Sequence, residues 1–374
     1  MARLARTTWS ALAGALLVAA GCGDGGDVPA RAETDEPGGL IIRRDVDLFA
    51  ALADDVRHPE GITANPTNGN VYVATFDVPS ATNPDPKNKV VRFDRRGKVL
   101  GSLDFGKTPL LGLAFDAVNE QVYITNVGNF AGVESKIQRV AADLSGLTDV
   151  AIIPGIGAPE PRTVANPDGS SDTITFGDNA RVPNAMAFDS TGNLYVTDSF
   201  QGAVYKISNP QGCAPSCDVE TLIHDPLLAT TGFPAFAANG IAVHPDGSAL
   251  FVANTGDDRV LKLDMATKTL TILAESINGA DGLGFDDRGR LWVAANQGDE
   301  LLALNETGGV VAKLGEFKGL RADGSPKGLL FPASLVIVDD DVFVTNLADA
   351  YTEPVGDEIE EQVKRFTVSH IKLP

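Results

Sequence analysis

Four side chains with metal-binding oxygens lie at the same position of a sequence motif that recurs along the chain. In order along the chain they are Glu60, Asn184, Asn239 and Asp281. Two further copies of the motif have Leu111 and Ala333 at this position. Carboxylate and amide oxygens are ligands that Ca²⁺ prefers, whereas zinc sites are mostly built from Cys and His. Two carboxylates held together away from water repel each other unless a cation lies between them.

These four side chains predict a divalent-metal site, with Ca²⁺ as the favoured ion, if the fold brings them together. Water or substrate would complete the six to eight oxygen ligands that Ca²⁺ takes. Asn and Asp also favour turns for local backbone reasons, so any one of the four alone would indicate a turn. Their recurrence at equivalent positions favours metal ligands.

The motif occurs in six copies, and these copies indicate the fold. The copies start at residues 60, 111, 184, 239, 281 and 333, at intervals of 51, 73, 55, 42 and 52 residues. Each copy contains a short apolar run, a turn rich in Gly and Asp, a second alternating run and a third, and a fourth run usually follows. Six units of four strands predict an all-β protein with a six-bladed β-propeller of four antiparallel strands per blade.

The two ends of the propeller are expected to meet. Residues 45–52 have a strand-like pattern before the first copy, and the last copy ends after a third strand near residues 363–370. The N-terminal strand is therefore predicted to close the last blade, so that no sheet edge of the ring stays free. The propeller is assigned to residues 39–374.

Loop lengths predict which face of the propeller binds a ligand. The turns at residues 66–69, 190–192 and 286–289 are short, whereas the connections that leave the other face are long: 76–89, 155–183, 225–238, 318–332 and 347–361. Long loops on a rigid scaffold commonly carry binding surfaces. The expected substrate rim on that face consists of Arg181, Phe233, Phe236, Asn254, Asn296 and Asn346. Residues 155–183 fit a lid and a plain surface loop equally well.

The N-terminus has the pattern of a bacterial lipoprotein signal. Arg3 and Arg6 precede an apolar run, and Ala19-Ala20-Gly21 precedes Cys22. Residues 1–21 are interpreted as a signal peptide, Cys22 as the lipidation site and residues 22–38 as a flexible tether. An ordinary secretory signal or a short membrane anchor is the alternative. The lipoprotein reading predicts an exported protein that is lipid-anchored in the bacterial cell envelope.

Charge and cysteine content narrow the partners. Without Arg3 and Arg6, 28 basic residues remain against 50 acidic ones, a net charge of −22. Such a surface repels nucleic acids and anionic lipids, so we expect no nucleic-acid partner and membrane contact only through the N-terminal lipid. Cys213 and Cys217 lie close together in a turn, and in an exported chain they are expected to form a disulfide.

The repeats also resemble a known family. Two segments are similar to motifs of the senescence marker protein/gluconolactonase family: Asn239-Gly-Ile and Asp281-Gly-Leu-Gly-Phe-Asp-Asp-Arg-Gly-Arg-Leu-Trp-Val-Ala. This family is related in architecture to paraoxonases and diisopropyl-fluorophosphatase. The resemblance covers residues 40–374. It implies a divalent metal in the central channel and hydrolysis of lactones or related esters. By position, Glu60, Asn239 and Asp281 resemble the family's metal ligands, and Asn184 the Asn that touches metal-bound water or substrate.

Some positions depart from the family pattern. Glu60 has no Trp close behind it, Ala185 stands in place of a Gly, and Val182 stands where an Arg is expected, with Arg181 one position earlier. These changes keep the metal-binding positions. They do not support a specificity for sugar-acid lactones.

Two functions from different classes follow. In the first, the metal polarises the carbonyl of a small lactone or ester, water attacks it, and Asp281 and Asn184 are the catalytic residues, with Asp281 the candidate general base. A metal-bound carboxylate is a weak base, so a group beyond the ligands is the alternative base. In the second, the chain is a non-catalytic NHL-like binding module, tethered to the envelope, with a structural metal. In both cases we expect a monomer.

Overall fold

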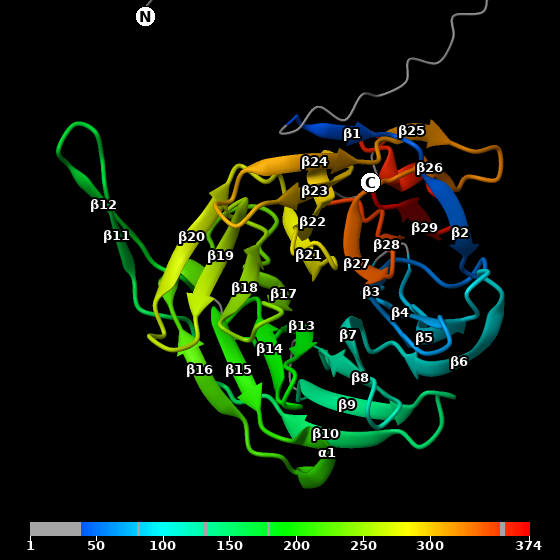
Figure 1. The fold of residues 1–374 in the computed structure, drawn as a ribbon, viewed down its shortest axis with the longest axis horizontal. Coiled ribbons are helices and arrows are strands. Elements are labelled where there is room, and N and C mark those ends of the chain that lie inside the picture. Colours follow the sequence, from blue (N-terminus) through cyan, green and yellow to red (C-terminus); the bar gives the residue numbers. More distant parts are fainter. Residues whose placement is uncertain (1–38, 81–82, 130–133, 178–179, 352–355) are drawn as a thin grey trace, which may run out of the picture. The chain divides into compact units, whose positions relative to one another are not determined.

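The computed structural model describes residues 39–80, 83–129, 134–177, 180–351 and 356–374, and these residues form six four-stranded antiparallel blades arranged in a ring (Figure 1). This confirms the predicted six-bladed β-propeller. In blades one to five the first strand in sequence lies nearest the centre of the ring, and in blade six β27 (Pro332–Val338) takes that place. Cys22 and the expected signal peptide and tether lie outside the described residues. Among the helices of the described part, none is long and apolar enough to cross a membrane.

The blades follow each other in chain order. Blade one consists of β3 (Pro59–Ala64), β4 (Val71–Thr75), β5 (Asn88–Phe93) and β6 (Val99–Gly106). Blade two consists of β7 (Leu110–Asp116), β8 (Gln121–Asn126), β9 (Lys136–Ala141) and β10 (Thr148–Ile152). Blade three consists of β13 (Pro183–Phe188), β14 (Leu194–Asp198), β15 (Ala203–Ile207) and β16 (Glu220–His224).

The second half of the ring repeats this arrangement. Blade four consists of β17 (Ala238–Val243), β18 (Ala249–Asn254), β19 (Arg259–Asp264) and β20 (Leu270–Glu275). Blade five consists of β21 (Ala280–Phe285), β22 (Leu291–Ala295), β23 (Glu300–Leu304) and β24 (Val310–Leu314). Blade six consists of β27 (Pro332–Val338), β28 (Asp341–Asn346), β29 (Thr367–Lys372) and β2 (Asp47–Ala51).

The N-terminal strand closes the ring, as the sequence predicts. β2 pairs antiparallel with β29, so that Asp47 lies opposite His370 and Ala51 opposite Thr367. The third strand of blade six begins later than expected, at Thr367. A second N-terminal strand, β1 (Ile41–Arg43), adds to the outside of blade five by pairing in parallel with β24. The sequence analysis did not anticipate this pairing.

Other elements lie outside the blades. The expected lid segment contains a hairpin, β11 (Arg162–Ala165) and β12 (Ser171–Ile174), which projects outward from the ring near blade four (Figure 1). A second hairpin consists of β25 (Phe317–Leu320) and β26 (Pro326–Gly328). The helices of the described residues are short: α1 (Pro210–Cys213), η1 (Pro226–Leu228), η2 (Asn296–Gly298) and η3 (Glu360–Gln362). A disulfide joins Cys213 to Cys217.

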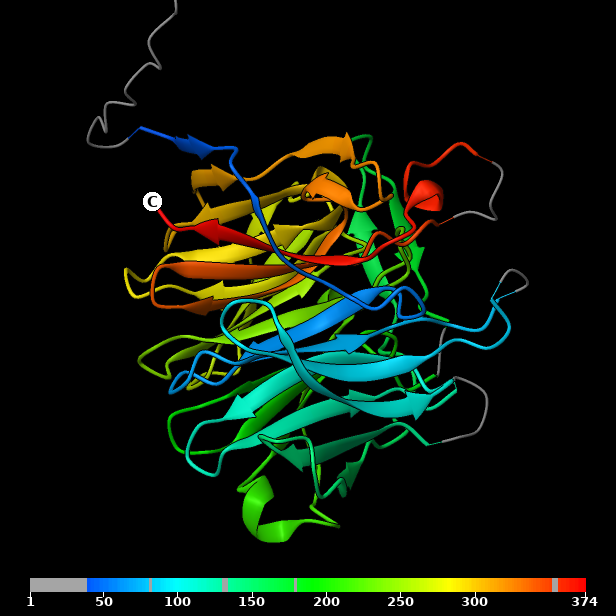
Figure 2. The ribbon, with the colours of Figure 1, turned by 90° about the vertical axis from the view of Figure 1, so that its right-hand side faces the viewer.

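Short turns at one end of the blades follow from local side-chain chemistry. In the turn of blade five, Asp286 Oδ1 accepts hydrogen bonds from the backbone N–H groups of Arg288, at 3.0 Å, and Arg290, at 2.9 Å. Gly289 supplies the positive φ of 75° that the turn needs. Asp286 Oδ2 accepts a further bond from the buried indole of Trp292, at 2.8 Å. Asp286 therefore ties the turn to the interior of the blade. Figure 2 shows the ring from the side, with the ends of the blades at the left and right.

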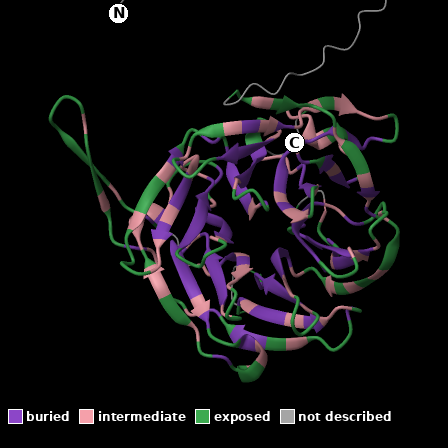
Figure 3. Ribbon diagram, viewed as in Figure 1, coloured by how far each residue is buried: buried purple, intermediate pink, exposed green. Residues whose placement is uncertain are grey.

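The core lies between the blades. The second and third strands are buried on both faces, and Trp292, Tyr72, Tyr123 and Tyr205 are among the largest fully buried side chains. Figure 3 shows buried residues concentrated in the inner strands and exposed residues in the outer strands. This explains why the inner strands consist mainly of Val, Leu, Ile and Ala rather than alternating with polar residues.

The innermost strands pack closely against their neighbours through a small residue that follows each site position. A Cβ atom added to Gly61 would lie 2.0 Å from the carbonyl oxygen of Leu111, and one added to Gly240 would lie 2.1 Å from that of Asp281. Neither distance leaves room for a methyl group, so Gly lets the backbones of adjacent blades touch around the channel. The Glu-Gly, Asn-Gly and Asp-Gly pairs of the sequence thus have a structural reason.

We expect Gly240→Ala to destabilise the propeller by about 1–3 kcal/mol, because the new methyl group has to push β17 away from β21. Chemical denaturation checks this. Gly101→Ala in β6 is the matched control, since nothing lies within 4 Å of its added Cβ. Equal denaturation midpoints for the two variants would contradict the close approach of the inner strands.

Candidate metal centre and the chamber around it

A β-bulge presents each of the repeated site positions. In blade one the pairing of β3 with β4 shifts between Pro59 and Ile62, and Glu60 and Gly61 lie in that interval. The register shifts at the equivalent place in the first strand of each of the other five blades. A bulge turns a side chain away from its regular direction in the sheet. The bulges thus explain how residues from four blades can face one chamber.

The chamber is a small cavity near the long loops. Its walls include all four predicted ligands, Glu60, Asn184, Asn239 and Asp281. These side chains are between 1 and 5% exposed. The cavity volume is about 40 Å³, which is room for an ion with one or two waters rather than for a lactone ring.

Several oxygens of residues that line the chamber have no hydrogen-bond partner among the described residues. They are Glu60 Oε2, Asn184 Oδ1, Asp281 Oδ1 and Asn296 Oδ1, and all four are fully buried. A buried polar atom without a partner costs stability, typically about 1–3 kcal/mol, so native proteins rarely leave several together. Because every one of these atoms is an oxygen acceptor, a cation or a donor such as water is the group they lack.

Hydroxyl groups fix the amides of two of the predicted ligands. Asn184 Nδ2 donates to Ser199 Oγ at 3.0 Å, and Ser199 Oγ donates to the carbonyl oxygen of Ala238 in the next blade at 2.8 Å. Asn239 Nδ2 donates to Thr255 Oγ1 at 3.0 Å, and Thr255 Oγ1 donates to the carbonyl oxygen of Ala280 at 2.7 Å. Because each nitrogen is engaged, the amide oxygen is the atom left for a ligand.

Asn296 holds Asp281 in a comparable way. Its Nδ2 donates to Asp281 Oδ2 at 3.0 Å, which leaves Oδ1 without a partner. The backbone of Glu60 is held as well, because Thr345 Oγ1 of blade six donates to its carbonyl oxygen at 2.7 Å. Ligand positions are therefore linked from blade to blade by hydrogen bonds.

The two carboxyl groups are electrostatically unfavourable in the chamber. Burial raises the pKa of Glu60 well above its usual value, and the charge of Asp281 raises it further. Burial also raises the pKa of Asp281, although the hydrogen bond from Asn296 opposes this rise. Among the described residues that line the chamber, none is Lys, Arg or His. A bound cation would supply the missing positive charge.

The donor set fits a hard divalent cation better than a transition metal. Among the described residues, no group of three or more His, Cys, Asp and Glu side chains is placed to hold a metal ion. The chamber instead combines the carboxyl groups of Glu60 and Asp281 with amide oxygens, and Asp349 adds a third carboxyl group to its wall. This mixture suits Ca²⁺. Glu60, Asn184, Asn239 and Asp281 are the residues that would hold it.

The predicted rim residues divide into two groups. Phe236 and Asn296 line the chamber, and Phe233, which is 63% exposed, packs against Tyr351 with ring centroids 4.6 Å apart. Asn254 and Asn346 do not line it. Asn254 Nδ2 donates to the carbonyl oxygens of Leu227 and Ala229. Asn346 Oδ1 accepts from the backbone N–H of Leu330, and its Nδ2 donates to two hydroxyl groups of β29.

The reason that Asn254 and Asn346 miss the chamber is the two-residue period of a strand. Each is the last residue of the second strand of its blade, and the chamber is reached one position later, at Thr255 and Leu347. Asn296 already occupies the later position. Arg181 is not a chamber residue either, and its guanidinium lies 3.8 Å from Glu134.

The apolar and aromatic cover of the chamber, and Asp349 beside it, were not predicted. Phe76 and Leu347 follow the second strands of their blades, as Ser199 and Thr255 do, so the repeat register carried a signal for them. Phe331, Asp349 and Tyr351 come from long loops whose conformation has no repeat. Tyr351 is packed between Phe233 and Phe331, whose ring centroids lie 4.6 and 5.1 Å from its own.

Without divalent cations, the free energy of unfolding should fall between about pH 5.5 and about pH 8. Glu60 and Asp281 have a higher pKa in the folded than in the unfolded state, so in this pH range the folded chain keeps protons that the unfolded chain has lost. For each proton kept, the free energy of unfolding falls by about 1.4 kcal/mol for every pH unit of increase. Asp281→Asn should make this slope shallower, by up to that amount. Urea denaturation in the presence of a chelator measures it.

Asp246→Asn is the control for this slope, because Asp246 lies in an exposed turn and its hydrogen bonds with Ser248 lower its pKa, away from the window. The same slope in wild-type and Asp281→Asn protein would contradict the raised pKa of the buried pair.

Ser199→Ala should weaken Ca²⁺ binding by roughly 10- to 100-fold, because the amide of Asn184 loses the partner that orients it. Ser199→Thr keeps a hydroxyl and should restore most of the affinity. Titration calorimetry measures both variants. Ser170→Ala, in the exposed turn between β11 and β12, is the control. Unchanged affinity in Ser199→Ala would show that Ser199 does not position the ligand.

Comparison with known proteins adds family evidence for two blades. Residues 227–315 match the model of the SMP-30/gluconolactonase/LRE-like region. This segment contains blades four and five and two of the predicted ligands, Asn239 and Asp281. No curated protein matches the sequence.

Several solved structures share the fold. Regucalcin, a calcium-binding protein from Agrobacterium tumefaciens, is 14% identical with a TM-score of 0.57, covering 90% of this chain and 95% of its own. A luciferin-regenerating enzyme is 13% identical with a TM-score of 0.56, covering 88% and 95%, and a streptogramin B lyase is 13% identical with a TM-score of 0.52, covering 88% and 98%. Identities this low show the fold alone. The chain is thus a six-bladed β-propeller that carries an SMP-30/gluconolactonase/LRE-like region, which confirms the family resemblance of its sequence.

Proposed function

We propose that the propeller is a hydrolase of the gluconolactonase type that binds a divalent cation, Ca²⁺ in first place, and acts on lactones or related esters. The observation that carries the proposal is the group of unpartnered, buried oxygens on Glu60, Asn184 and Asp281 around one chamber. The match of residues 227–315 to the SMP-30/gluconolactonase/LRE-like region supports the same class. So does the fold shared with a calcium-binding protein.

Each chamber residue has a distinct task in this function. Glu60, Asn239 and Asp281 would hold the cation, and Asn184 would bind the cation, water or the substrate oxygen through Oδ1. When bound, the cation supplies Lewis acidity for the carbonyl carbon under attack. Asp281 is the candidate general base, because Asn296 occupies Oδ2 and leaves Oδ1 without a hydrogen-bond partner. The aromatic cover excludes bulk water, which strengthens every charge interaction inside.

Substrate has to reach the chamber from a larger neighbouring space, since the chamber itself has only about 40 Å³. A cavity of about 420 Å³ shares the walls Phe76, Asp349 and Tyr351 with it. Drug-sized ligands occupy cavities of roughly 300–1,000 Å³. We place the body of the substrate in the larger cavity and its reacting carbonyl at the chamber.

The small volume of the chamber also favours a second candidate function. A cation enclosed there without access for a substrate would be structural, and the propeller would then be a non-catalytic binding module. Fold alone does not separate these two functions. Activity measured together with metal content does.

The protein should hydrolyse lactones and aryl esters. Chelation or Asp281→Ala should lower kcat/KM by at least about 100-fold, because the loss of a metal ligand has a larger effect than the loss of a residue that only orients a ligand. Initial rates and metal content by mass spectrometry measure this. Asp246→Ala, in a turn, is the control. Hydrolysis that resists both treatments would remove the metal mechanism. No hydrolysis with one tightly bound metal would favour the binding module.

A further inference from the structure

The cavity of about 420 Å³ beside the chamber has walls of unusual chemistry. Carboxylates and aromatic rings line it together: Asp77, Asp349, Glu360, Glu361, Phe76, Tyr351 and Phe366. We call this space the antechamber. Because it shares Phe76, Asp349 and Tyr351 with the chamber, whatever it binds lies next to the candidate metal centre.

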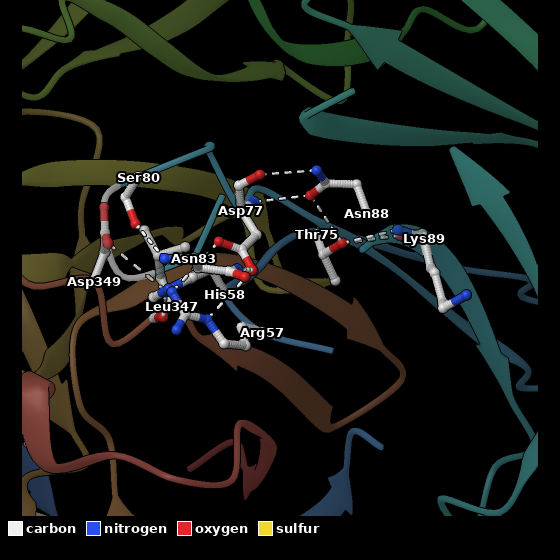
Figure 4. A network of polar contacts seen from close by, with 10 residues as sticks. All are labelled: Arg57, His58, Thr75, Asp77, Ser80, Asn83, Asn88, Lys89, Leu347 and Asp349. Atoms are coloured by element: carbon white, nitrogen blue, oxygen red, sulfur yellow. Dashed lines mark hydrogen bonds and ion pairs between the residues drawn. The ribbon is translucent and has the colours of Figure 1, made fainter. Parts of the chain in front are cut away.

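Arg57 is the one guanidinium among the described residues of the antechamber wall, and it is already paired. Arg57 Nε lies 3.3 Å from Asp77 Oδ2, and Arg57 Nη2 donates to Asp77 Oδ1 at 3.4 Å. Asn83 Nδ2 also donates to Asp77 Oδ2, at 2.8 Å. Figure 4 shows these contacts. The charges of Arg57 and Asp77 therefore offset each other, and neither is left to attract an ionic ligand.

His58 is held in the antechamber wall by two hydrogen bonds, and its Nδ1 also lies 3.7 Å from Asp349 Oδ1. Its Nδ1 lies 3.1 Å from the carbonyl oxygen of Leu347, so Nδ1–H donates there and Nε2 is left to accept from Arg57 Nη2, which lies 3.1 Å away (Figure 4). His58 is a neutral part of the wall.

Asp349 and Glu360 line the antechamber, and among the described residues no Lys or Arg side chain forms an ion pair with either. Burial raises the pKa of Asp349 to about 7, Asp77 raises it further, and Arg57 only partly opposes the rise. Burial and the nearby Glu358 raise the pKa of Glu360. A positively charged ligand would favour the ionised form of both carboxyl groups and be attracted to it, whereas a negatively charged ligand would be repelled.

The aromatic rings decide which kind of cation fits. No three acidic, His or Cys side chains of the described residues converge tightly enough for a metal ion. Faces of Phe and Tyr attract organic cations, above all ammonium groups, which are large and weakly hydrated. Tyr351 is well fixed for this, between Phe233 and Phe331. The combination of rings and dispersed carboxylates thus favours an organic ammonium group over a second metal.

We propose that the antechamber binds the ammonium group of a cationic ester or lactone, and that its aromatic and acidic walls select this substrate class for the neighbouring centre. The selection of a substrate rests on the proposed hydrolase function, but the binding of an organic cation does not. The nearby buried oxygens of Glu60 and Asp281 add a second source of attraction when the chamber holds no metal, so binding has to be measured with Ca²⁺ present.

Choline and 3,3-dimethylbutanol test the binding, because they have nearly the same shape and differ in charge. Titration calorimetry with Ca²⁺ present should show choline binding at least about 10-fold more tightly, as expected for a desolvated cation–π site with carboxylates. Asp349→Asn and Glu360→Gln should each remove a large part of this preference, about 3- to 10-fold. Glu306→Gln, in an exposed turn between β23 and β24, should leave it unchanged.

Equal affinity for choline and its neutral analogue would overturn the proposal. So would a preference that survives both Asp349→Asn and Glu360→Gln. Choline binding that persists in Asp281→Ala supports the antechamber as the site. Binding lost in Asp281→Ala and kept in Glu360→Gln would place the cation in the chamber and reject the antechamber.

Hydrolysis of acetylcholine and of 3,3-dimethylbutyl acetate separates this inference from the proposed function. A higher kcat/KM for acetylcholine, reduced in Glu360→Gln, supports both. Hydrolysis of the two esters at equal rates keeps the hydrolase and rejects the antechamber as its selective site. Selective binding of choline without hydrolysis of either ester keeps the antechamber and counts against the hydrolase.

Discussion

Two buried carboxyl groups around one small chamber are the constraint on which the centre of this propeller depends. Glu60 and Asp281 come from blades one and five, are each 3% exposed, and raise the energy of the folded chain when both are ionised. A hydrophobic channel would be easier to fold. The amides of Asn184 and Asn239, whose nitrogens are each held by a hydroxyl group, leave their oxygens for a ligand and make the arrangement favourable for a cation.

The ring builds this arrangement with means that also hold it together. A bulge at the start of each inner strand turns the site residue, and at Gly61 and Gly240 the absence of a side chain lets the next blade approach. The hydroxyl groups that orient Asn184 and Asn239 donate to the backbone of the following blade. The packing of the blades and the geometry of the site therefore rest on the same few contacts, and a change in one alters the other.

The sequence predicted the parts of the molecule that repeat. Six copies of one motif predicted six blades, and the missing outer strand of the last blade predicted its closure by the N-terminal strand. The register of the copies predicted that Glu60, Asn184, Asn239 and Asp281 lie together. Asn254 and Asn346 were chosen one residue too early, because the strand period sends them away from the chamber. Asp349 and Tyr351 lie in a long loop whose path depends on packing, which no periodicity encodes. The signal peptide and the lipid on Cys22 stay predictions.

The most direct measurement is a crystal structure of the protein grown with Ca²⁺, in which anomalous scattering locates the ion. A single peak should lie in the chamber, roughly 2.3–2.6 Å from side-chain oxygens of Glu60, Asn184, Asn239 and Asp281. A chamber that holds only water at saturating Ca²⁺, with these four side chains in their present positions, would contradict a metal centre on the propeller axis.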